Sequence, residues 1–145
     1  MIGVLIVSHG GIGEGLLEQA RVIAGDLPVV EALGVKGDVP PDATRARIAE
    51  AIGRLDRGKG VLILTDMFGG TPSNVALSFL DEGGRLEVLS GVNLPMLLKL
   101  VTARTEEAGL AEVAADLKAA GRKNIALARE IMGTPGSLVT KAKAQ

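Results

Sequence analysis

The stretch that decides the fold is VLIVSHGG, residues Val4–Gly11. Four aliphatic residues run directly into Ser-His-Gly-Gly, and His9 is the only histidine in the chain. An apolar run ended by glycines predicts a buried strand that stops in a tight turn. Apolar residues then recur at helical spacing from Ile12 to Gly25. The sequence therefore places His9 at a strand-to-helix turn, where an α/β sheet presents its carboxyl edge to ligands.

A second stretch, GVLILTD at Gly60–Asp66, has the same design but ends in an acid. It continues as MFGGTPSN, in which Thr71 is predicted as a helix N-cap and Pro72 as the first helical residue. If both strands belong to one parallel sheet, their carboxyl ends lie on the same edge. We therefore expect His9 and Asp66 to be neighbours.

The remaining segments alternate between strand-like and helix-like patterns. This alternation predicts right-handed crossovers and an α/β fold with a doubly wound, mainly parallel sheet and helices on both faces. Further strands are expected at Pro28–Val35 and Arg85–Gly91, and helices at Asp42–Leu55, after Pro72, at Pro95–Val101 and at Leu110–Ala120.

The C-terminal part of the chain has a weaker pattern. Residues 1–132 are predicted to form one domain, and residues 133–145 a mobile tail. Within the domain, Asn124–Ala128 alternates weakly, which fits either an antiparallel edge strand or the end of a helix. No internal repeat and no second domain is recognised.

Composition excludes several classes of function. The chain has 145 residues, 47% hydrophobic but only 1% aromatic, so a single core must be built from aliphatic side chains. Sixteen basic against 17 acidic residues leave a net charge of −1, which attracts neither nucleic acid nor an anionic membrane. No apolar stretch approaches the roughly 20 residues of a membrane span, and the N-terminus lacks a signal peptide. We expect a cytoplasmic protein without direct membrane insertion.

His9 is the first candidate for chemistry, because imidazole can serve as base, nucleophile or metal ligand near neutral pH. A metal site is not expected, since the chain has no second histidine and no cysteine. A Ser8–His9 acyl-transfer pair is also disfavoured, because adjacent strand residues point to opposite faces. The glycines after His9 match neither a dinucleotide fingerprint nor a Walker A motif. Instead, the amides of Gly10 and Gly11 at a helix start can hold a phosphate, although tight strand–helix packing explains them equally well.

The residues at the second strand end also have two interpretations. Asp66 is either a turn former or a carboxylate that orients the imidazole and stabilises its charge. Thr71 either caps the helix or offers its hydroxyl or amide to a phosphoryl oxygen. Met67 and Phe68 either fold onto the core or form an apolar docking surface beside the site.

These two stretches, together with GVNLPML at Gly91–Leu97, resemble the enzyme IIA component of the mannose-type phosphotransferase system. The resemblance extends to about Met132. It implies that His9 accepts a phosphoryl group, originally from phosphoenolpyruvate, from the histidine phosphocarrier protein and passes it to a IIB partner without a cofactor. By position, Asp66 is then the hydrogen-bonding partner of His9, and Gly70 and Thr71 belong to the phosphate-binding Gly-Gly-Ser/Thr-Pro loop.

The resemblance leaves several alternatives open. Many members continue into a IIB domain, and since this chain stops at Gln145, the IIB component is expected on a separate chain. Stand-alone members serve either sugar uptake or regulation. The phosphotransfer subunit of dihydroxyacetone kinase has a similar Val-Ser-His turn, and a non-enzymatic small-anion-binding module would need the same sheet edge. An aromatic-poor core with much aliphatic surface and a C-terminal segment able to pair as an edge strand predict a homodimer. The resemblance adds that Asn124–Ala128 forms an antiparallel strand exchanged between the subunits.

Overall fold

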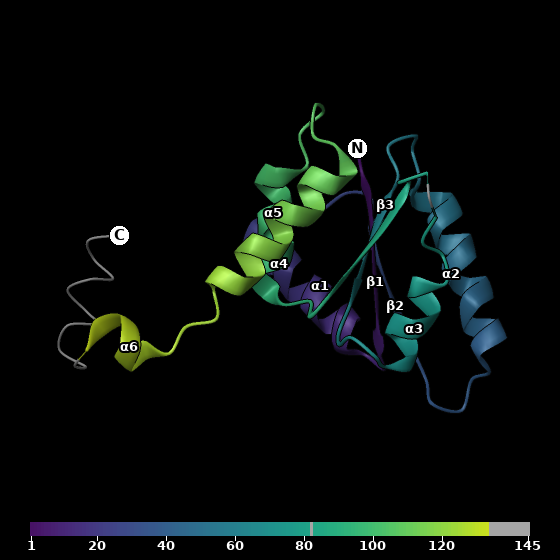
Figure 1. The fold of residues 1–145 in the computed structure, drawn as a ribbon, viewed down its shortest axis with the longest axis horizontal. Coiled ribbons are helices and arrows are strands. Elements are labelled where there is room, and N and C mark those ends of the chain that lie inside the picture. The colour runs from purple at the N-terminus through teal and green to yellow at the C-terminus, as the bar shows by residue number, and fades with distance from the viewer. Residues whose placement is uncertain (82, 134–145) are drawn as a thin grey trace.

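The protein is described by a computed structural model that covers residues 1–81 and 83–133. Strands and helices alternate up to β4, after which the described chain is helical (Figure 1). The elements in chain order are β1 (Gly3–His9), α1 (Ile12–Ala24), β2 (Val30–Val35), α2 (Pro41–Leu55), β3 (Val61–Thr65), α3 (Thr71–Leu77), β4 (Leu86–Ser90), α4 (Leu94–Ala103), α5 (Leu110–Lys123) and α6 (Ala128–Met132).

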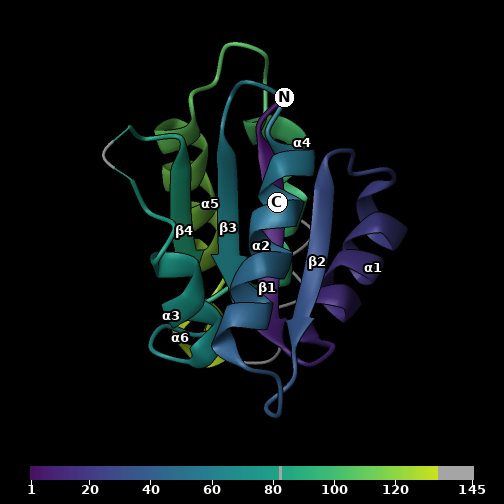
Figure 2. The same cartoon turned by 90° about the vertical axis from the view of Figure 1, so that its right-hand side faces the viewer.

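The four strands form one parallel sheet in the order β2-β1-β3-β4 (Figure 2). Val4 of β1 is in register with Val30 of β2 on one side and with Leu62 of β3 on the other. The chain thus winds from β1 to β2, then crosses back over β1 to reach β3. The predicted doubly wound α/β fold is confirmed, and the winding reverses between β1 and β3. In such sheets the crevice at this reversal is the usual place for a ligand.

The sheet lies between two layers of helices (Figure 1), and an apolar core fills the space on each of its faces. Val4 and Ile6 of β1 face the layer made by α1, α4 and α5, whereas Leu5 and Val7 face α2 and α3. All four side chains are fully buried. Both faces of β1 are therefore covered, which explains why its sequence is a continuous apolar run instead of an alternating one.

The outer edge of β2 is occupied by arginines. The carbonyl of Val35 points toward β1, because it accepts a hydrogen bond from the turn after β1. Carbonyl directions alternate along a strand, so the carbonyls of Val30 and Gly34 point away from the sheet. These two outward carbonyls accept hydrogen bonds of 3.1 Å from Arg21 of α1 and Arg47 of α2. Two guanidinium groups, one from each helical layer, thus satisfy edge groups that an added strand would need.

The other edge, β4, is different. No guanidinium in the described chain donates to a β4 carbonyl, and the Val88 amide bonds to the carboxylate of its own neighbour, Glu87, at 3.1 Å. A groove of about 380 Å³ runs beside this strand. It is lined by Phe68, Leu77, Glu87, Val88, Leu89, Ser90, Ala111, Ala114, Ala115 and Lys118.

The loop before β3 is held by Asp56. Its Oδ1 accepts hydrogen bonds from the amides of Gly58 (2.9 Å) and Gly60 (3.2 Å), and its Oδ2 accepts one of 2.6 Å from Arg85. The hydrogen bond from Arg85 and those from the two amides lower the pKa of Asp56 below its ordinary value, against the opposing effect of burial. This carboxylate fixes the entry of β3 into the sheet.

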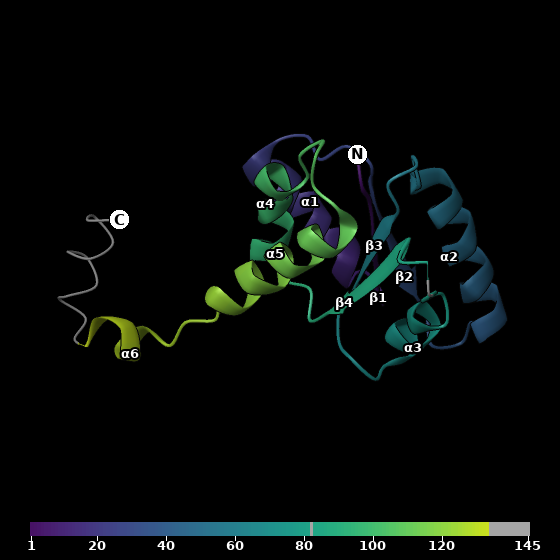
Figure 3. The same cartoon turned by 45° about the horizontal axis from the view of Figure 1, so that its top comes forward.

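The C-terminal segment departs from one expectation. The chain forms no strand at Asn124–Ala128: α5 ends at Lys123, and the residues that follow lead into the short helix α6, which lies away from the sheet (Figure 3). All strand pairs in the sheet are parallel. An antiparallel edge strand would have to pair with a strand of the sheet, and this segment reaches none in the single chain. A mobile tail was predicted for residues 133–145, and all of these except Gly133 lie outside the described residues.

Candidate functional site

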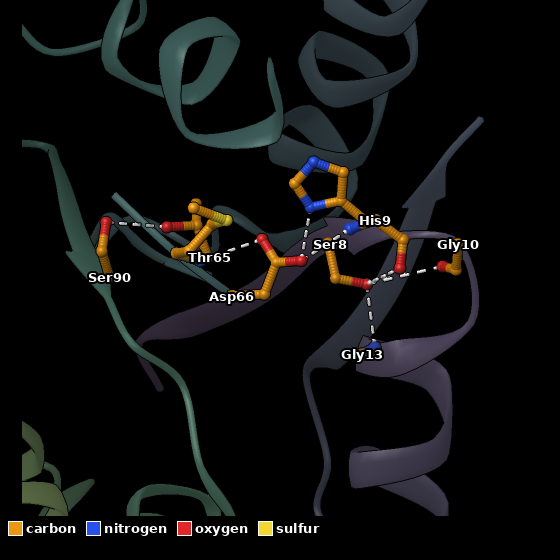
Figure 4. A network of polar contacts seen from close by, with 8 residues as sticks. Ser8, His9, Gly10, Gly13, Thr65, Asp66 and Ser90 are labelled. Atoms are coloured by element: carbon orange, nitrogen blue, oxygen red, sulfur yellow. Dashed lines mark hydrogen bonds and ion pairs between the residues drawn. The ribbon is translucent and has the colours of Figure 1, made fainter. Parts of the chain in front are cut away.

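The structure brings His9 and Asp66 together at the reversal point of the sheet (Figure 4). His9 is the last residue of β1, and Asp66 directly follows β3. Since side chains alternate along a strand, His9 continues the face of Leu5 and Val7, the side covered by α2 and α3. The imidazole is 48% exposed, while the carboxylate is only 11% exposed. The site is thus a half-exposed imidazole that is hydrogen-bonded to a nearly buried carboxylate.

Both oxygens of Asp66 accept hydrogen bonds. Oδ2 lies 2.7 Å from His9 Nδ1 and 2.9 Å from the backbone nitrogen of His9, and Oδ1 lies 3.0 Å from the amide nitrogen of Met67. Burial by itself raises the pKa of Asp66, but the hydrogen bonds from the backbone and ring of His9 and from Met67 outweigh it. The pKa of Asp66 is therefore lower than its ordinary value.

An ionised Asp66 determines the tautomer of His9. A carboxylate without a proton can only accept, so the 2.7 Å bond requires the hydrogen to be on Nδ1. In the neutral ring, Nε2 then carries a free lone pair, and it points away from Asp66 (Figure 4). If Nε2 gains a bond and the ring becomes cationic, the same carboxylate stabilises the charge. This arrangement suits a nucleophile or a general base.

Ser8 takes no part in this chemistry but shapes the turn. The side chain is fully buried and faces α1, opposite to His9, as expected from strand alternation. Its hydroxyl accepts a hydrogen bond of 2.8 Å from the amide of Gly13 and donates one of 3.2 Å to the carbonyl of His9. Ser8 thus satisfies one of the free amides at the start of α1. This role of Ser8 was not predicted, because a serine five residues before a helical amide is only a weak signal in the sequence.

Gly10 and Gly11 form the turn between β1 and α1. Gly10 has φ +47°, a left-handed conformation that glycine adopts readily. Its amide donates to the carbonyl of Val35 at 3.0 Å, so it is already engaged. The amide of Gly11 has no partner within the described residues. Of the two, Gly11 has the amide that is free to meet an anion.

The loop before α3 passes directly over the ring. A Cβ added to Gly70 would lie 2.9 Å from Cε1 and 3.4 Å from Nε2 of His9, so this backbone borders the free nitrogen. The predicted cap is wrong: Gly70 is the N-cap and Thr71 is the first helical residue, with Pro72 after it. The physical reason is that Pro is accepted equally in the second position of the first turn, where its missing N–H is also not needed. The Thr71 hydroxyl therefore caps nothing.

Met67 and Phe68 form an exposed apolar rim directly after Asp66. Met67 is 55% exposed and Phe68 is 73% exposed, so neither folds onto the core. A Cβ added to Gly70 would lie 3.4 Å from Cγ of Met67, whereas Phe68 lines the groove beside β4. Neither a group of three or more potential metal ligands nor a helix long and apolar enough to cross a membrane is found in residues 1–81 and 83–133.

Comparison with known proteins places this chain in a family. The model of the EIIA-man family, described as PTS system fructose IIA component, matches residues 3–118, which include His9 and Asp66. The chain is 31% identical over 136 residues to the PTS system fructose-specific EIIA component of Bacillus subtilis, covering 90% of this chain and 88% of that one. It is 32% identical over 127 residues to the PTS system mannose-specific EIIAB component of Escherichia coli, covering 86% of this chain and 38% of that one.

Solved structures agree with these relatives. The chain resembles phosphotransferase system component EIIA from Streptococcus agalactiae with a TM-score of 0.77 and 30% identity, covering 88% of this chain and 97% of that one. The mannose/sorbose-specific IIA subunit from Enterococcus faecalis gives a TM-score of 0.77 at 26% identity, with 87% and 93% coverage. The chain is thus an α/β protein of the EIIA-man family, whose model matches most of its length. The relatives given above are named as EIIA or EIIAB components of phosphotransferase systems, and the chain spans 38% of the length of the Escherichia coli EIIAB component.

Proposed function

We propose that this chain is a phosphocarrier that holds a phosphoryl group on Nε2 of His9. The observation that carries the proposal is the 2.7 Å hydrogen bond between His9 Nδ1 and an ionised Asp66, which leaves Nε2 as the nucleophile. The donor is the histidine phosphocarrier protein of the phosphotransferase system, and the acceptor is a IIB component. No cofactor is required. Family membership supports this role, as relatives are named for EIIA components of sugar systems.

The transfer balances without any further reactant. The lone pair of Nε2 forms a bond to phosphorus while the phosphorus–nitrogen bond of the donor histidine breaks and returns its electron pair to the donor ring. His9 then carries the phosphoryl group on Nε2 and the proton on Nδ1, with a positive ring next to Asp66. The carboxylate lowers the energy of this cationic ring. In the transfer to IIB, the bond between phosphorus and Nε2 of His9 breaks and its electron pair returns to Nε2, while a nucleophile of IIB forms the new bond to phosphorus.

Three backbone amides are suited to bind the phosphoryl oxygens. The amides of Gly11, Gly70 and Thr71 have no partner in the described chain, and Gly70 borders Nε2. The hydroxyl of Thr71 is an additional donor, since it caps no helix. Gly10 contributes through the shape of the turn, and its amide would join only by exchanging its bond to Val35. Preorganised donors of this kind favour the charge that develops during phosphoryl transfer.

We assign partner docking to Met67 and Phe68. An apolar rim beside a reactive histidine lets a second protein exclude water while its own histidine approaches. Since both side chains are more than half exposed, their apolar surface is available to a partner. Partners of this kind operate in the cytoplasm, which is where we place the protein.

We also propose a homodimer built on the β4 edge. The open edge and its groove accept an added strand, and the exposed Ile125 (79%) and Leu127 (64%) have no core of their own chain to cover them. Asn124–Ala128 of a second copy is the segment we expect to add there. A chain truncated after Asn124 retains all of α5 and should lose dimerisation in light scattering. A monomeric mass for the intact chain at micromolar concentration contradicts the proposal.

Phosphorylation with purified components tests the function. The chain is incubated with radiolabelled phosphoenolpyruvate, enzyme I and the histidine phosphocarrier protein. We expect one acid-labile label per chain, on His9, that a IIB component removes. Absence of label would favour a small-anion-binding module. A label that passes only to a dihydroxyacetone kinase would favour the phosphotransfer subunit of that enzyme, and loss to a regulatory target instead of IIB would indicate a regulatory role.

A further inference from the structure

The end of β2 supports the turn that carries His9. Gly34 lies on the face of β2 that looks toward α1, and the turn from β1 to α1 passes directly over it. A Cβ built on Gly34 would lie 2.2 Å from the carbonyl oxygen and 3.0 Å from the carbonyl carbon of Gly10. These are backbone atoms, which cannot rotate away as the end of a flexible side chain can. Any residue other than glycine must therefore displace the turn.

Two hydrogen bonds hold this contact in place. The amide of Gly10 donates to the carbonyl of Val35 at 3.0 Å, which ties the turn to the last residue of β2. The carbonyl of Gly34 accepts a bond of 3.1 Å from Arg47, which ties the same strand end to α2. The carbonyl of Gly10 is thus held at a fixed distance above β2. His9 is the residue immediately before Gly10, so its position depends on the same contact.

We propose that Gly34 is a positioning residue for His9, acting through the carbonyl of Gly10. The lack of a side chain at position 34 lets the turn approach β2 closely enough for His9 to make both of its bonds to Asp66, at 2.7 and 2.9 Å. With a Cβ present, the turn rises by about 1 Å to restore normal contact distances. The two hydrogen bonds of His9, from its backbone nitrogen and from Nδ1, cannot both be kept after this movement, because the same oxygen of Asp66 accepts them.

The test compares Gly34→Ala with Gly37→Ala. Gly37 lies in the loop after β2, where an added Cβ meets nothing within 4 Å, so this variant controls for the loss of backbone freedom. The first readout is the nitrogen-15 spectrum of the single imidazole. In the wild type and Gly37→Ala we expect a fixed Nδ1-protonated tautomer. In Gly34→Ala the two nitrogen shifts should move toward each other as the bond to Asp66 weakens.

The second readout is the rate of phosphorylation, and this arm rests on the proposed function. A misplacement of about 1 Å costs up to roughly 100-fold in rate. We expect a 10- to 100-fold lower rate constant at saturating donor in Gly34→Ala, with an unchanged KM for the donor, because the docking rim is untouched. Gly37→Ala should match the wild type in both constants.

The outcomes separate the two proposals. If the wild type is never phosphorylated, the proposed function fails, whereas the spectra still test the placement of His9. Should Gly34→Ala be unfolded, Arg47→Ala removes a tie to Gly34 without adding an atom, and it should produce a smaller shift in the same direction. Wild-type imidazole shifts in a folded Gly34→Ala, or in Arg47→Ala if the former does not fold, would overturn the inference.

Discussion

Two aspartates bracket β3, and they have nearly the same surroundings. Asp56, before the strand, accepts two backbone amides and the guanidinium of Arg85 at 2.6 Å. Asp66, after it, accepts two backbone amides and the imidazole of His9 at 2.7 Å. Hydrogen bonds lower the pKa of both.

The difference lies in the partner. Arginine has no lone pair to offer and keeps its proton, so the Asp56 pair can only hold the chain together. Histidine held by its Nδ1 proton retains a lone pair on Nε2, so the Asp66 pair can also form a bond. Location matters as well, because only the carboxyl end of β3 lies at the reversal point of the sheet. The same local hydrogen bonds are therefore structural at one end of a strand and suited to chemistry at the other.

The largest expected effect is on the imidazole itself. His9→Ala should abolish phosphorylation while leaving the fold intact, because the ring is half exposed and the backbone amide of residue 9 still bonds to Asp66. Labelling by phosphoenolpyruvate with the two upstream proteins measures it, and circular dichroism confirms folding. Labelling of this variant at the wild-type rate would mean that another side chain is the acceptor.

The second-largest effect is expected at Asp66, and it distinguishes a carboxylate that orients the imidazole from one that only forms a turn. Asp66→Asn preserves size but removes charge, and its amide can present a donor to Nδ1. We expect phosphorylation to slow by about 10- to 100-fold, as for other carboxylates that orient an imidazole. The melting temperature should stay close to that of the wild type, because asparagine also suits a turn. Unchanged transfer kinetics would return Asp66 to a purely structural role like that of Asp56.

Replacement of Asp56, the structural one of the two aspartates, should have the opposite effect on stability and on transfer. Asp56→Ala removes the acceptor for Gly58, Gly60 and Arg85, and we expect a loss of about 1–2 kcal/mol in the free energy of unfolding. Phosphorylation kinetics should be unchanged, since the opposite end of β3 remains in place. Denaturant unfolding measures the loss, with the exposed Asp38→Ala as control. A slowed transfer without loss of stability would break the distinction between the two ends.

The smallest effect concerns pH. Because the folded-state pKa of each aspartate lies below the ordinary value of 3.8, each stabilises the fold fully above that value. This stabilisation disappears as the pH falls through the lower folded-state pKa. Asp66→Asn and Asp56→Asn should each lose stability less steeply than the wild type below about pH 4. Denaturant unfolding at a series of pH values measures the slopes, and equal slopes in all three proteins would contradict the shifts.

The sequence was sufficient to predict the sheet and the central pair. β1 and β3 are buried on both faces, so they appear as unbroken apolar runs, and the residue that faces the crevice is the last of β1 and the first after β3. Neither Asp56 nor Gly34 could be identified this way. Asp56 acts through Arg85, 29 residues away, and Gly34 through a turn 24 residues earlier, so only folding brings the partners together.

The C-terminal segment could not be predicted for another reason. Asn124–Ala128 has a weak alternation that is compatible with two structures, and burial against other elements normally decides between them. In the single chain nothing buries this segment, so neither prediction was fulfilled and a short helix follows at Ala128. The Thr71 cap failed on a smaller scale, because a proline signal locates a helix start only to within a residue or two.

The arginines on β2 bear on how large an assembly this sheet can form. Arg21 and Arg47 occupy two outward carbonyls at this edge, which disfavours strand addition there relative to β4. In the proposed homodimer each sheet gains Asn124–Ala128 of the other copy next to β4, and this reciprocal exchange around a two-fold axis is complete with two chains. A sheet with two open edges can continue without limit into a filament. Two hydrogen bonds on the side of the sheet remote from β4 therefore favour a closed assembly over a polymer.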